Sequence, residues 1–405
     1  MNPRRILLAD ADAFFVAVAR MVDPDGAGRA SLLIVGGTRE SRGVVCSASY
    51  EARKYGVRSA MPIARALRLC PQAMCVPVPR RACGEKSREI RAALEKYAPV
   101  VEGASIDEWY MDLGGTEALY DHEPLALTAA RIRDEVVKRT TLSVSIGGGT
   151  SKLVAKLAVE RAKPKPGSGA TGVHIVTPGD EGRFLATFDL AEIPFIGPRF
   201  QERLAKLGMR RVPDVLQYDL PTLTQWLGAR EAEWLYDRVR GVDHGDVEAH
   251  GEAKSISRDE TFPADIDDDR ELARELLALV TRAAADLRGD GLKARTITVR
   301  IRDHDFKTRQ ASRTLDAAVI SDRVILEVAR SLLGKLRSAR RVPARLLGVG
   351  LSSLAADAAV AQLTLFEKRD AKTDETDRDR VLARTVDRVR ARFGDKGLLP
   401  ARLID

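Results

Sequence analysis

Two adjacent carboxylates constrain the fold of this chain more than any other feature. Asp107 and Glu108 lie between two segments typical of strands, residues 100–101 and residues 109–111. Because side chains alternate between the faces of a strand, a regular buried strand would force one of these acids into a core. A turn or a strand end lets both acids reach one site, where a divalent cation is a common counter-charge. A polar hairpin tip is the alternative explanation for the pair.

A second acidic segment, at the N-terminus, favours the metal-binding interpretation. The apolar run from Arg5 to Ala9 is typical of a buried strand, and it leads directly into Asp10-Ala11-Asp12-Ala13-Phe14-Phe15. An acid at the end of a buried strand requires a cation or hydrogen bonds to offset its desolvation. The second acidic segment therefore strengthens the metal-binding interpretation of Asp107 and Glu108 relative to a polar hairpin tip.

Composition limits the class of protein. The 405 residues suffice for two to four domains, and 44% apolar residues suit folded cores. We expect a cytoplasmic protein, because no apolar run approaches the ~20 residues of a membrane span and no signal region is evident. The four cysteines form no C-x-x-C pair, which predicts free thiols. The net charge of +8 is compatible with a polyanionic partner.

The order of apolar patterns predicts a multidomain α+β protein. Residues 1–177 mix strands and helices without regular alternation, which favours an α+β domain with an inserted lobe over a doubly wound fold. Within them, residues 142–146 are predicted as a strand that ends where Gly147-Gly148-Gly149 begins. Residues 183–242 are helical, and residues 254–351 follow the order strand–helix–strand–strand–helix–strand. A charged amphipathic helix is predicted for residues 377–393.

Three segments are candidates for binding phosphate. Tyr50 and Arg53 share one helical face, where a phenol and a guanidinium can hold phosphate oxygens, or where they simply form a solvated face. The turn before Gly197 indicates a helix–hairpin–helix whose backbone N–H groups suit a DNA phosphate, with a plain helical hairpin as the alternative. In residues 296–302 the alternation directs Arg300 and Arg302 to solvent, which favours a basic sheet face for a phosphate backbone.

In combination these segments identify a family. The chain resembles the Y-family translesion DNA polymerases, within them the bacterial DNA polymerase IV (DinB) branch, over roughly residues 5 to 366. The motifs that carry the resemblance occur in one order: residues 10–15, Tyr50-Glu51-Ala52-Arg53, Ser105-Ile106-Asp107-Glu108, Ala162-Lys163-Pro164, Ile193-Pro194-Phe195-Ile196-Gly197, Lys254-Ser255-Ile256-Ser257-Arg258 and Gln362-Leu363-Thr364-Leu365-Phe366.

The resemblance implies a low-fidelity, template-directed DNA polymerase that extends a primer with dNTPs past damaged template. It implies two Mg²⁺ ions held by Asp10, Asp107, Glu108 and the backbone carbonyl of Ala11. It further implies the following contacts: nucleotide at Phe14, Phe15, Tyr50, Arg53 and Lys163, with Phe15 as the steric gate against ribose; DNA at Gly197, Arg258, Arg300, Arg302 and Arg313; and a sliding clamp, the beta subunit of the replicative polymerase, at Gln362, Leu363, Leu365 and Phe366.

The implied architecture is a right hand, and we expect it to act as a monomer on primer–template DNA. Its parts are a ferredoxin-like palm (1–11 and 80–177), fingers (12–79), a helix–hairpin–helix thumb (178–242), a linker (243–253), a little finger (254–356) and a tail (357–405). Three residues depart from the family pattern: Ala19, Phe195, where glycine is usual, and Trp109. A non-catalytic DNA- and clamp-binding relative and a nucleotidyl cyclase are the rival interpretations.

Overall fold

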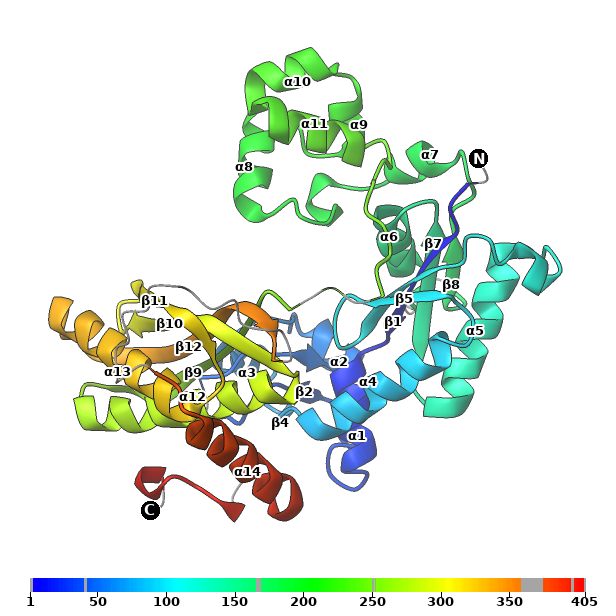
Figure 1. Ribbon diagram of the computed structural model, residues 1–405. Coiled ribbons are helices and arrows are strands. Elements are labelled where there is room, and N and C mark those ends of the chain that lie inside the picture. Colours follow the sequence, from blue (N-terminus) through cyan, green and yellow to red (C-terminus); the bar gives the residue numbers. More distant parts are fainter. Residues whose placement is uncertain are drawn as a thin grey trace. The chain divides into compact units, whose positions relative to one another are not determined.

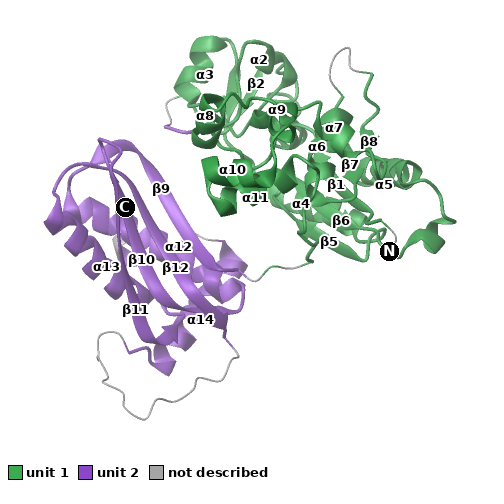
Figure 2. Cartoon of the chain, turned by 90° about the horizontal axis from the view of Figure 1, so that it is seen from above, with its two compact units in different colours: residues 1–39, 44–251 green, residues 40–43, 252–405 purple. Residues whose placement is uncertain are grey.

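The computed structural model describes residues 3–39, 42–164, 169–249, 251, 253–357, 374–394 and 397–403. The chain divides into two compact units, unit 1 with residues 1–39 and 44–251 and unit 2 with residues 40–43 and 252–405 (Figure 2). No helix within the described ranges is long and apolar enough to cross a membrane.

A five-stranded sheet organises unit 1, with strand order β5–β6–β1–β7–β8. Its strands are β1 (Ile6–Ala11), β5 (Val100–Gly103), β6 (Glu108–Asp112), β7 (Val144–Gly149) and β8 (Val173–Ile175). The central strand β1 is buried throughout and pairs antiparallel with both β6 and β7. Asp10, near the C-terminal end of β1, therefore lies beside Glu108 at the start of the neighbouring strand β6.

Helices cover both faces of this sheet (Figure 1). Leu7 and Ala9 of β1 pack in one core with α4 (Arg80–Leu94) and α5 (Leu125–Thr140). Ile6 and Leu8 pack on the opposite side against α6 (Lys152–Ala162). Since side chains alternate along a strand, Asp10 has the same facing as Ile6 and Leu8, toward α6.

The glycine run after Ile146 belongs to strand β7, so the prediction that the strand ends at Ile146 is wrong. Gly147 explains the difference, because a Cβ built there would lie 2.1 Å from the backbone nitrogen of Val159 in α6. The missing side chain lets helix α6 approach the strand closely. The glycines therefore act in packing, and they bring α6 near the end of β1.

The rest of unit 1 consists of a small lobe and a helical subdomain. The lobe has strand order β3–β2–β4 and the helices α1, α2 and α3. Its elements are α1 (Phe14–Val22), β2 (Leu33–Val35), β3 (Ser47–Ala48), α2 (Tyr50–Lys54), α3 (Ile63–Leu69) and β4 (Met74–Val76). The helical subdomain contains α7 (Glu181–Leu185), the 3-10 helix η2 (Leu190–Glu192), α8 (Pro198–Lys206), α9 (Val212–Leu216), α10 (Leu220–Leu227) and α11 (Ala229–Arg238). A further 3-10 helix, η1 (Glu117–Tyr120), precedes α5.

The segment predicted as a linker is anchored to unit 1 in its first half. Asp243 accepts a hydrogen bond from the backbone nitrogen of Leu153 at 3.1 Å, and Glu102 accepts one from that of Glu248 at 2.9 Å. Val247 is buried beside Ile6 and Leu8. These contacts make residues 243–248 part of the layer that covers the sheet.

Unit 2 is a four-stranded antiparallel sheet, order β11–β10–β12–β9, with two long helices packed on one face. Its elements follow the predicted order: β9 (Ser255–Ile266), α12 (Asp269–Gly289), β10 (Leu292–Asp303), β11 (Thr308–Val319), α13 (Asp322–Ala339) and β12 (Ala344–Ala356). The predicted C-terminal helix is present as α14 (Asp377–Phe393), and the 3-10 helix η4 (Ala401–Leu403) follows.

Helix α14 attaches to unit 2 through its acidic side chains. Asp387 accepts hydrogen bonds at 2.5 and 2.8 Å from Arg288, whose side chain is almost fully buried. Asp379 pairs with Arg323 at 2.9 Å. Val381 and Leu382 remain exposed, so polar contacts dominate this attachment.

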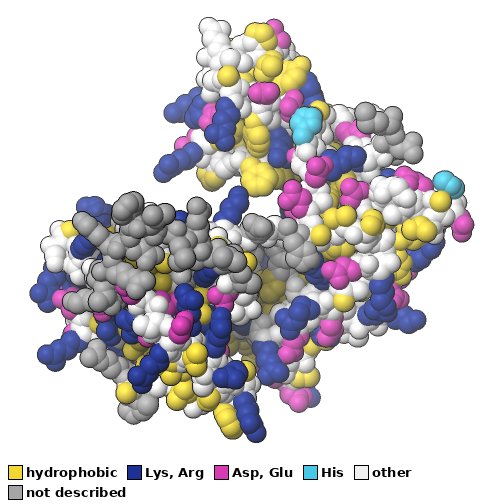
Figure 3. Space-filling view, in the orientation of Figure 1, with side chains coloured by type: hydrophobic (Ala, Val, Ile, Leu, Met, Phe, Trp, Pro, Cys, Tyr) yellow, Lys and Arg dark blue, Asp and Glu magenta, His cyan; other side chains and the backbone are white. Residues whose placement is uncertain are grey.

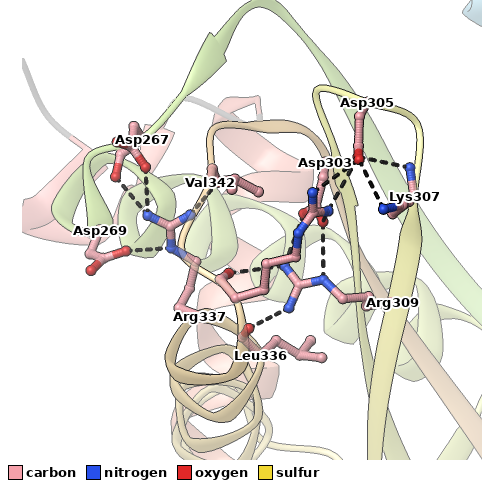
Figure 4. A network of polar contacts seen from close by, with 10 residues as sticks. Asp267, Asp269, Asp303, Asp305, Lys307, Arg309, Leu336, Arg337 and Val342 are labelled. Carbon is pink, nitrogen blue, oxygen red and sulfur yellow. Dashed lines mark hydrogen bonds and ion pairs between the residues drawn. The ribbon is translucent and has the colours of Figure 1, made fainter.

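A network around Asp303 fixes the turn between β10 and β11 to the end of α13 (Figure 4). Asp303 is fully buried, and it pairs with Arg309 at 2.9 Å and also with Arg340. Arg340 contacts Asp305 at 2.9 Å, so a second acid shares the charge. A buried carboxylate requires such partners, because an unpaired charge in a core is strongly destabilising.

Candidate active site

The two acidic segments meet at the end of strand β1. Asp10 lies directly opposite Glu108 in the antiparallel pairing of β1 and β6, so both side chains have the same facing, toward α6. Asp107 lies in the turn before β6, and its carbonyl accepts a hydrogen bond from the nitrogen of Ala11 at 2.9 Å. Asp107 and Glu108 thus lie at a hairpin turn and also beside Asp10. The two interpretations of the pair, a hairpin tip and a shared acidic site, are therefore compatible.

Two lysines of the α6 segment neutralise these acids. Lys163, the C-cap of α6, lies 2.8 Å from Asp10, and Lys156 forms an ion pair with Glu108. Burial raises the pKa of Asp10 to about 7; the charge of Lys163 opposes this shift and that of Glu108 adds to it. The site therefore holds a carboxylate whose ionised form is poorly stabilised by the protein alone.

The donor set fits a hard divalent cation. Carboxylate and backbone carbonyl oxygens are the ligands that Mg²⁺ prefers, and Asp10, Asp107, Glu108 and the carbonyl of Ala11 can supply them. Burial raises the pKa of Asp10, and a bound cation would favour its ionised form. In the part of the chain that the structure describes, no three acidic, thiol or imidazole groups already form a metal cluster. Ion pairs with Lys156 and Lys163 occupy two of the acids instead.

Asp12 belongs to the same strand end but has different partners. Its carboxylate accepts hydrogen bonds from the hydroxyls of Ser143 at 2.7 Å and Ser145 at 2.9 Å. Its backbone nitrogen donates to the carbonyl of Ser143. Asp12 therefore ties the end of β1 to β7 and holds the segment that follows.

The predicted phosphate-binding residues of α2 lie near this site. Burial raises the pKa of Tyr50, the negative charge of Asp12 adds to the shift, and Arg53 and Lys163 oppose it. The Arg53 guanidinium lies 5.2 Å from the Tyr50 ring centroid and donates to the carbonyl of Ala48 at 2.9 Å. The structure thus brings Tyr50, Arg53 and Lys163 into one electrostatic environment with the acids.

Phe14 and Phe15 begin helix α1 immediately after the acidic strand end. The left-handed backbone of Ala13, at φ 47°, turns the chain from the strand into this helix. Phe14 is buried in the sheet core, while Phe15 is half-buried with its ring centroid 5.6 Å from that of Phe14. Phe15 therefore keeps an accessible surface at the start of the helix that follows the acidic strand end.

Trp109 does not line the site. It follows Glu108 on strand β6 and so points to the opposite face, where it is buried in the core with α4 and α5. Its cross-strand partner is the small residue Ala9, which leaves room for the indole ring. The departure from the family pattern at this position is a packing feature.

Residues of α6 are functional candidates that the sequence reasoning missed. Lys156 pairs with Glu108, and Lys152 holds Glu102 of β5 at 2.7 Å. The two lysines are four residues apart and therefore share one face of the helix. This spacing is visible in the sequence, but the strand that faces it depends on how α6 packs.

The candidate DNA contacts of unit 2 fall on opposite sides of its sheet. Arg300 pairs across the strands with Gly348, whereas Arg258 pairs with the buried Val349 and so points toward the helices. There Arg258 forms an ion pair with Asp286 at 2.5 Å. Arg302 shares the open side with Arg300, and the register of Arg313 opposite the buried Ile297 places it on the helix side.

The open side of this sheet carries hydroxyl groups and a hollow. Thr296 contacts Thr314 and Ser353 at 2.9 Å, and Thr298 contacts Ser312 at the same distance. A hollow of about 300 Å³ lies beside these strands, lined among others by Arg300. Hydroxyl and guanidinium groups on an exposed sheet suit contacts with a phosphate backbone.

Gly197 is the N-cap of α8, as a helix–hairpin–helix requires, and Pro198 occupies the first helical position. The clamp-binding candidates Gln362, Leu363, Leu365 and Phe366 lie outside the described residues.

Comparisons with known proteins agree with this arrangement. Residues 9–160 match the impB/mucB/samB family, residues 253–365 match the C-terminal domain of the same family, and residues 191–243 match the thumb domain of DNA polymerase-iota. The DNA polymerase IV of Dehalococcoides mccartyi strain CBDB1 is 37% identical over 382 residues, which are 93% of this chain and 94% of that protein. The chain belongs to the Y-family of DNA polymerases, in its DNA polymerase IV branch.

Further relatives support this family membership. The DNA polymerase IV of Methanoculleus marisnigri is 39% identical over 87% of this chain and 94% of that protein. A Y-family DNA polymerase chimera, Dbh-Dpo4(243-245)-Dbh, superposes with a TM-score of 0.73 at 26% identity, over 86% of this chain and 98% of that chain. DinB from Sulfolobus solfataricus gives a TM-score of 0.57 at 28% identity over the same shares. The fold is accordingly the α+β right hand of this family, with palm, fingers, thumb and little finger.

Proposed function

We propose that this protein, a DNA-directed DNA polymerase by its family, extends primers with dNTPs past damaged or distorted template. The observation that carries this proposal is the meeting of Asp10, Asp107 and Glu108 at one strand end beside Tyr50, Arg53 and Lys163. Acids that can hold cations, next to groups that can hold phosphates, suit nucleotidyl transfer.

The metal ligands in this proposal are Asp10, Asp107, Glu108 and the carbonyl of Ala11. Two Mg²⁺ ions held there would lower the pKa of the primer 3′-hydroxyl and neutralise the triphosphate and the departing pyrophosphate. Asp12 with Ser143 and Ser145 keeps the end of β1 in register, so the acids stay in place. Lys156 and Lys163 hold the carboxylates of Glu108 and Asp10 in the free protein.

The nucleotide is bound by residues of the small lobe and of α6. The phenol of Tyr50, the guanidinium of Arg53 and the ammonium of Lys163 donate hydrogen bonds to the triphosphate oxygens. Phe15 places an aromatic edge under the sugar, where it leaves no room for a ribose 2′-hydroxyl. Phe14 supports that ring from the core side.

The parts of the hand follow the boundaries given above, with palm 1–11 and 80–177, fingers 12–79, thumb 178–242 and little finger 254–356. The thumb contacts a DNA phosphate near Gly197, and Lys and Arg side chains gather on the α8 side of the helical subdomain (Figure 3). In the little finger, the structure favours Arg300 and Arg302 over Arg258 and Arg313, because only the first two share the open face.

The peptide Gln362-Leu363-Thr364-Leu365-Phe366 is proposed to dock in a sliding clamp, which would keep a weakly gripping enzyme on its template. The support for this docking is the sequence, in which apolar side chains follow an alanine-rich segment. We place the enzyme in the cytoplasm, at the nucleoid during repair, because chromosomal DNA is its proposed substrate.

A primer-extension assay tests the proposal. The enzyme is given one dNTP at a time with Mg²⁺, on an undamaged template and on a template with a lesion opposite the next position. We expect incorporation on both templates and frequent incorporation of wrong nucleotides. DNA binding without any extension would instead indicate a non-catalytic accessory protein, and conversion of free nucleoside triphosphate without primer would indicate a cyclase.

A further inference from the structure

One aromatic side chain of the helical subdomain occupies an unfavourable backbone position. Residues 193–196 form a β-turn that is closed by a hydrogen bond from the nitrogen of Ile196 to the carbonyl of Ile193 at 3.2 Å. Phe195, the third residue of this turn, has φ 72°. With Pro194 at the second position, the turn has the features of type II, whose third position normally takes glycine.

Phe195 is unfavourable there for two separate reasons. A side chain with a Cβ is strained at positive φ, and the strain is greatest for bulky residues. The ring is also 82% exposed to solvent, so burial does not offset the strain. Strained residues that persist in a fold are concentrated at functional sites, where the backbone conformation serves a contact.

One basic side chain contacts the Phe195 ring and leaves most of the ring open to solvent. The guanidinium of Arg238 lies 5.6 Å from the Phe195 ring centroid and 5.3 Å from that of Trp234. A cation–π contact at this distance favours the observed position of the ring without burying it. The ring is therefore an exposed apolar surface at the tip of the hairpin.

The chemistry around this surface limits what can cover it. Gly197, two residues later, is the N-cap of helix α8, and Arg199 and Arg203 lie within that helix. A helix N-terminus and basic side chains favour an anion, whereas the phenyl ring favours an apolar surface. A DNA strand combines both, because each phosphate is joined to a deoxyribose whose ring carbons are apolar.

We propose that Phe195 packs against a deoxyribose of the DNA strand whose phosphate is held at the start of α8. The contact adds affinity for duplex DNA without adding an ionic interaction. This inference rests on the proposed role of the helical subdomain as the thumb that binds primer–template DNA.

The test compares Phe195→Gly with Phe195→Trp in the full-length protein. Affinity for a fluorescent primer–template duplex is measured by anisotropy at several salt concentrations, and stability is measured by thermal unfolding. Phe195→Gly should be at least as heat-stable as the wild type, because glycine relieves the strained turn. It should also bind the duplex roughly three- to tenfold more weakly. Phe195→Trp, which keeps an aromatic ring, should restore most of the affinity.

The salt dependence separates a packing contact from an ionic one. Phe195→Gly should leave the slope of log affinity against log salt concentration unchanged, whereas Arg199→Ala, at the exposed start of α8, should reduce it. Leu119→Ala serves as the matched control, since Leu119 is 78% exposed and lies in η1, outside the thumb. Its affinity should equal that of the wild type.

Two results would overturn the inference. One is a Phe195→Gly affinity within twofold of the wild type, and the other is a Phe195→Trp variant as weak as the glycine variant. Failure of the proposed function is distinguishable from both, because the wild type itself would then neither bind nor extend the primer–template.

Discussion

Two buried aspartates, one in each unit of the molecule, show how the partners of a charge decide its use. Asp10 in unit 1 is 6% exposed, faces Glu108 across the strands and is held by Lys163. Asp303 in unit 2 is fully buried and is held by the guanidiniums of Arg309 and Arg340. The two residues occupy similar positions at the end of an antiparallel strand, but their charge balance differs.

The arginines around Asp303 complete its hydrogen bonding and neutralise it within the fold. At Asp10 a second carboxylate lies opposite, and burial raises the pKa to about 7 despite Lys163. A satisfied buried carboxylate stabilises local structure, whereas an incompletely compensated one is suited to recruit a cation. The comparison predicts that changes in unit 1 affect chemistry and that changes at Asp303 affect stability.

The largest effect is expected for Asp107→Ala. Loss of a metal-binding carboxylate should reduce the extension rate by about 10³-fold or more, because the charge of the reacting phosphates is no longer offset. Steady-state extension and duplex anisotropy are measured on one preparation, and the affinity for DNA should stay within about threefold. Asp134→Asn on the exposed surface of α5 is the control, and it should extend primers normally. An Asp107→Ala enzyme that still extends primers would refute the claim that the acids of unit 1 serve the chemistry.

The second prediction concerns Asp303→Asn. Removing this charge leaves Arg309 and Arg340 without their shared partner and should destabilise unit 2 by about 3 kcal/mol. Chemical denaturation followed by circular dichroism measures the loss, and Asp316→Asn, an exposed neighbour on β11, should show no such change. At low temperature the folded fraction should still incorporate nucleotides. Equal stability of the two variants would refute the structural role of Asp303.

Phe15→Ala should have an intermediate effect that is confined to sugar selection. Without the aromatic ring, a ribose 2′-hydroxyl finds space, and the preference for dNTP over rNTP should fall about 10- to 100-fold. The ratio of kcat/KM for the two nucleotides measures this preference, while the value for dNTP should change less than the ratio. Unchanged discrimination would show that Phe15 is not the steric gate.

The smallest effect is expected on the open face of unit 2. The double change Arg300→Ala and Arg302→Ala should weaken duplex binding several-fold and reduce the salt slope by about 1 to 2. Arg258→Ala, whose side chain pairs with Asp286 on the helix side, should leave the slope unchanged. The measurement is anisotropy across a salt series. If Arg258→Ala changed the salt slope more than the double change does, the helix side and not the open side would be the DNA-binding face.

Much of the site could be predicted from local sequence. Asp10 lies near the end of one apolar strand, and Asp107 and Glu108 lie at the start of another. These positions favoured a shared site, and the family resemblance assigned the three acids to it. The lysine partners could not be predicted, because the approach of Lys156 to Glu108 depends on tertiary packing of α6 against Gly147. Helix and strand order in unit 2 followed from alternation, which each element carries in its own residues.

The side of the sheet on which each arginine of unit 2 lies can be predicted from the sequence of its strand. Ile256 and Arg258 are two residues apart on β9, so their side chains lie on the same side of the sheet. Because the apolar Ile256 packs against the core, Arg258 lies on the helix side as well. On β11, Arg313 is two residues from the buried Leu315, so it also lies on the helix side. The family resemblance implied DNA contacts at Arg258 and Arg313, whereas the alternation of side chains along a strand gives the side of the sheet.

The most direct test of this account is the single-turnover rate of Asp10→Asn, measured together with the melting temperature of the same preparation. Asparagine keeps the shape of the side chain and removes the charge that burial disfavours. We predict a nucleotide incorporation rate at least about 10³-fold below that of the wild type, with a melting temperature equal to or above the wild-type value. A variant that retains its rate, or one that loses stability as Asp303→Asn does, would contradict the assignment of Asp10 to chemistry.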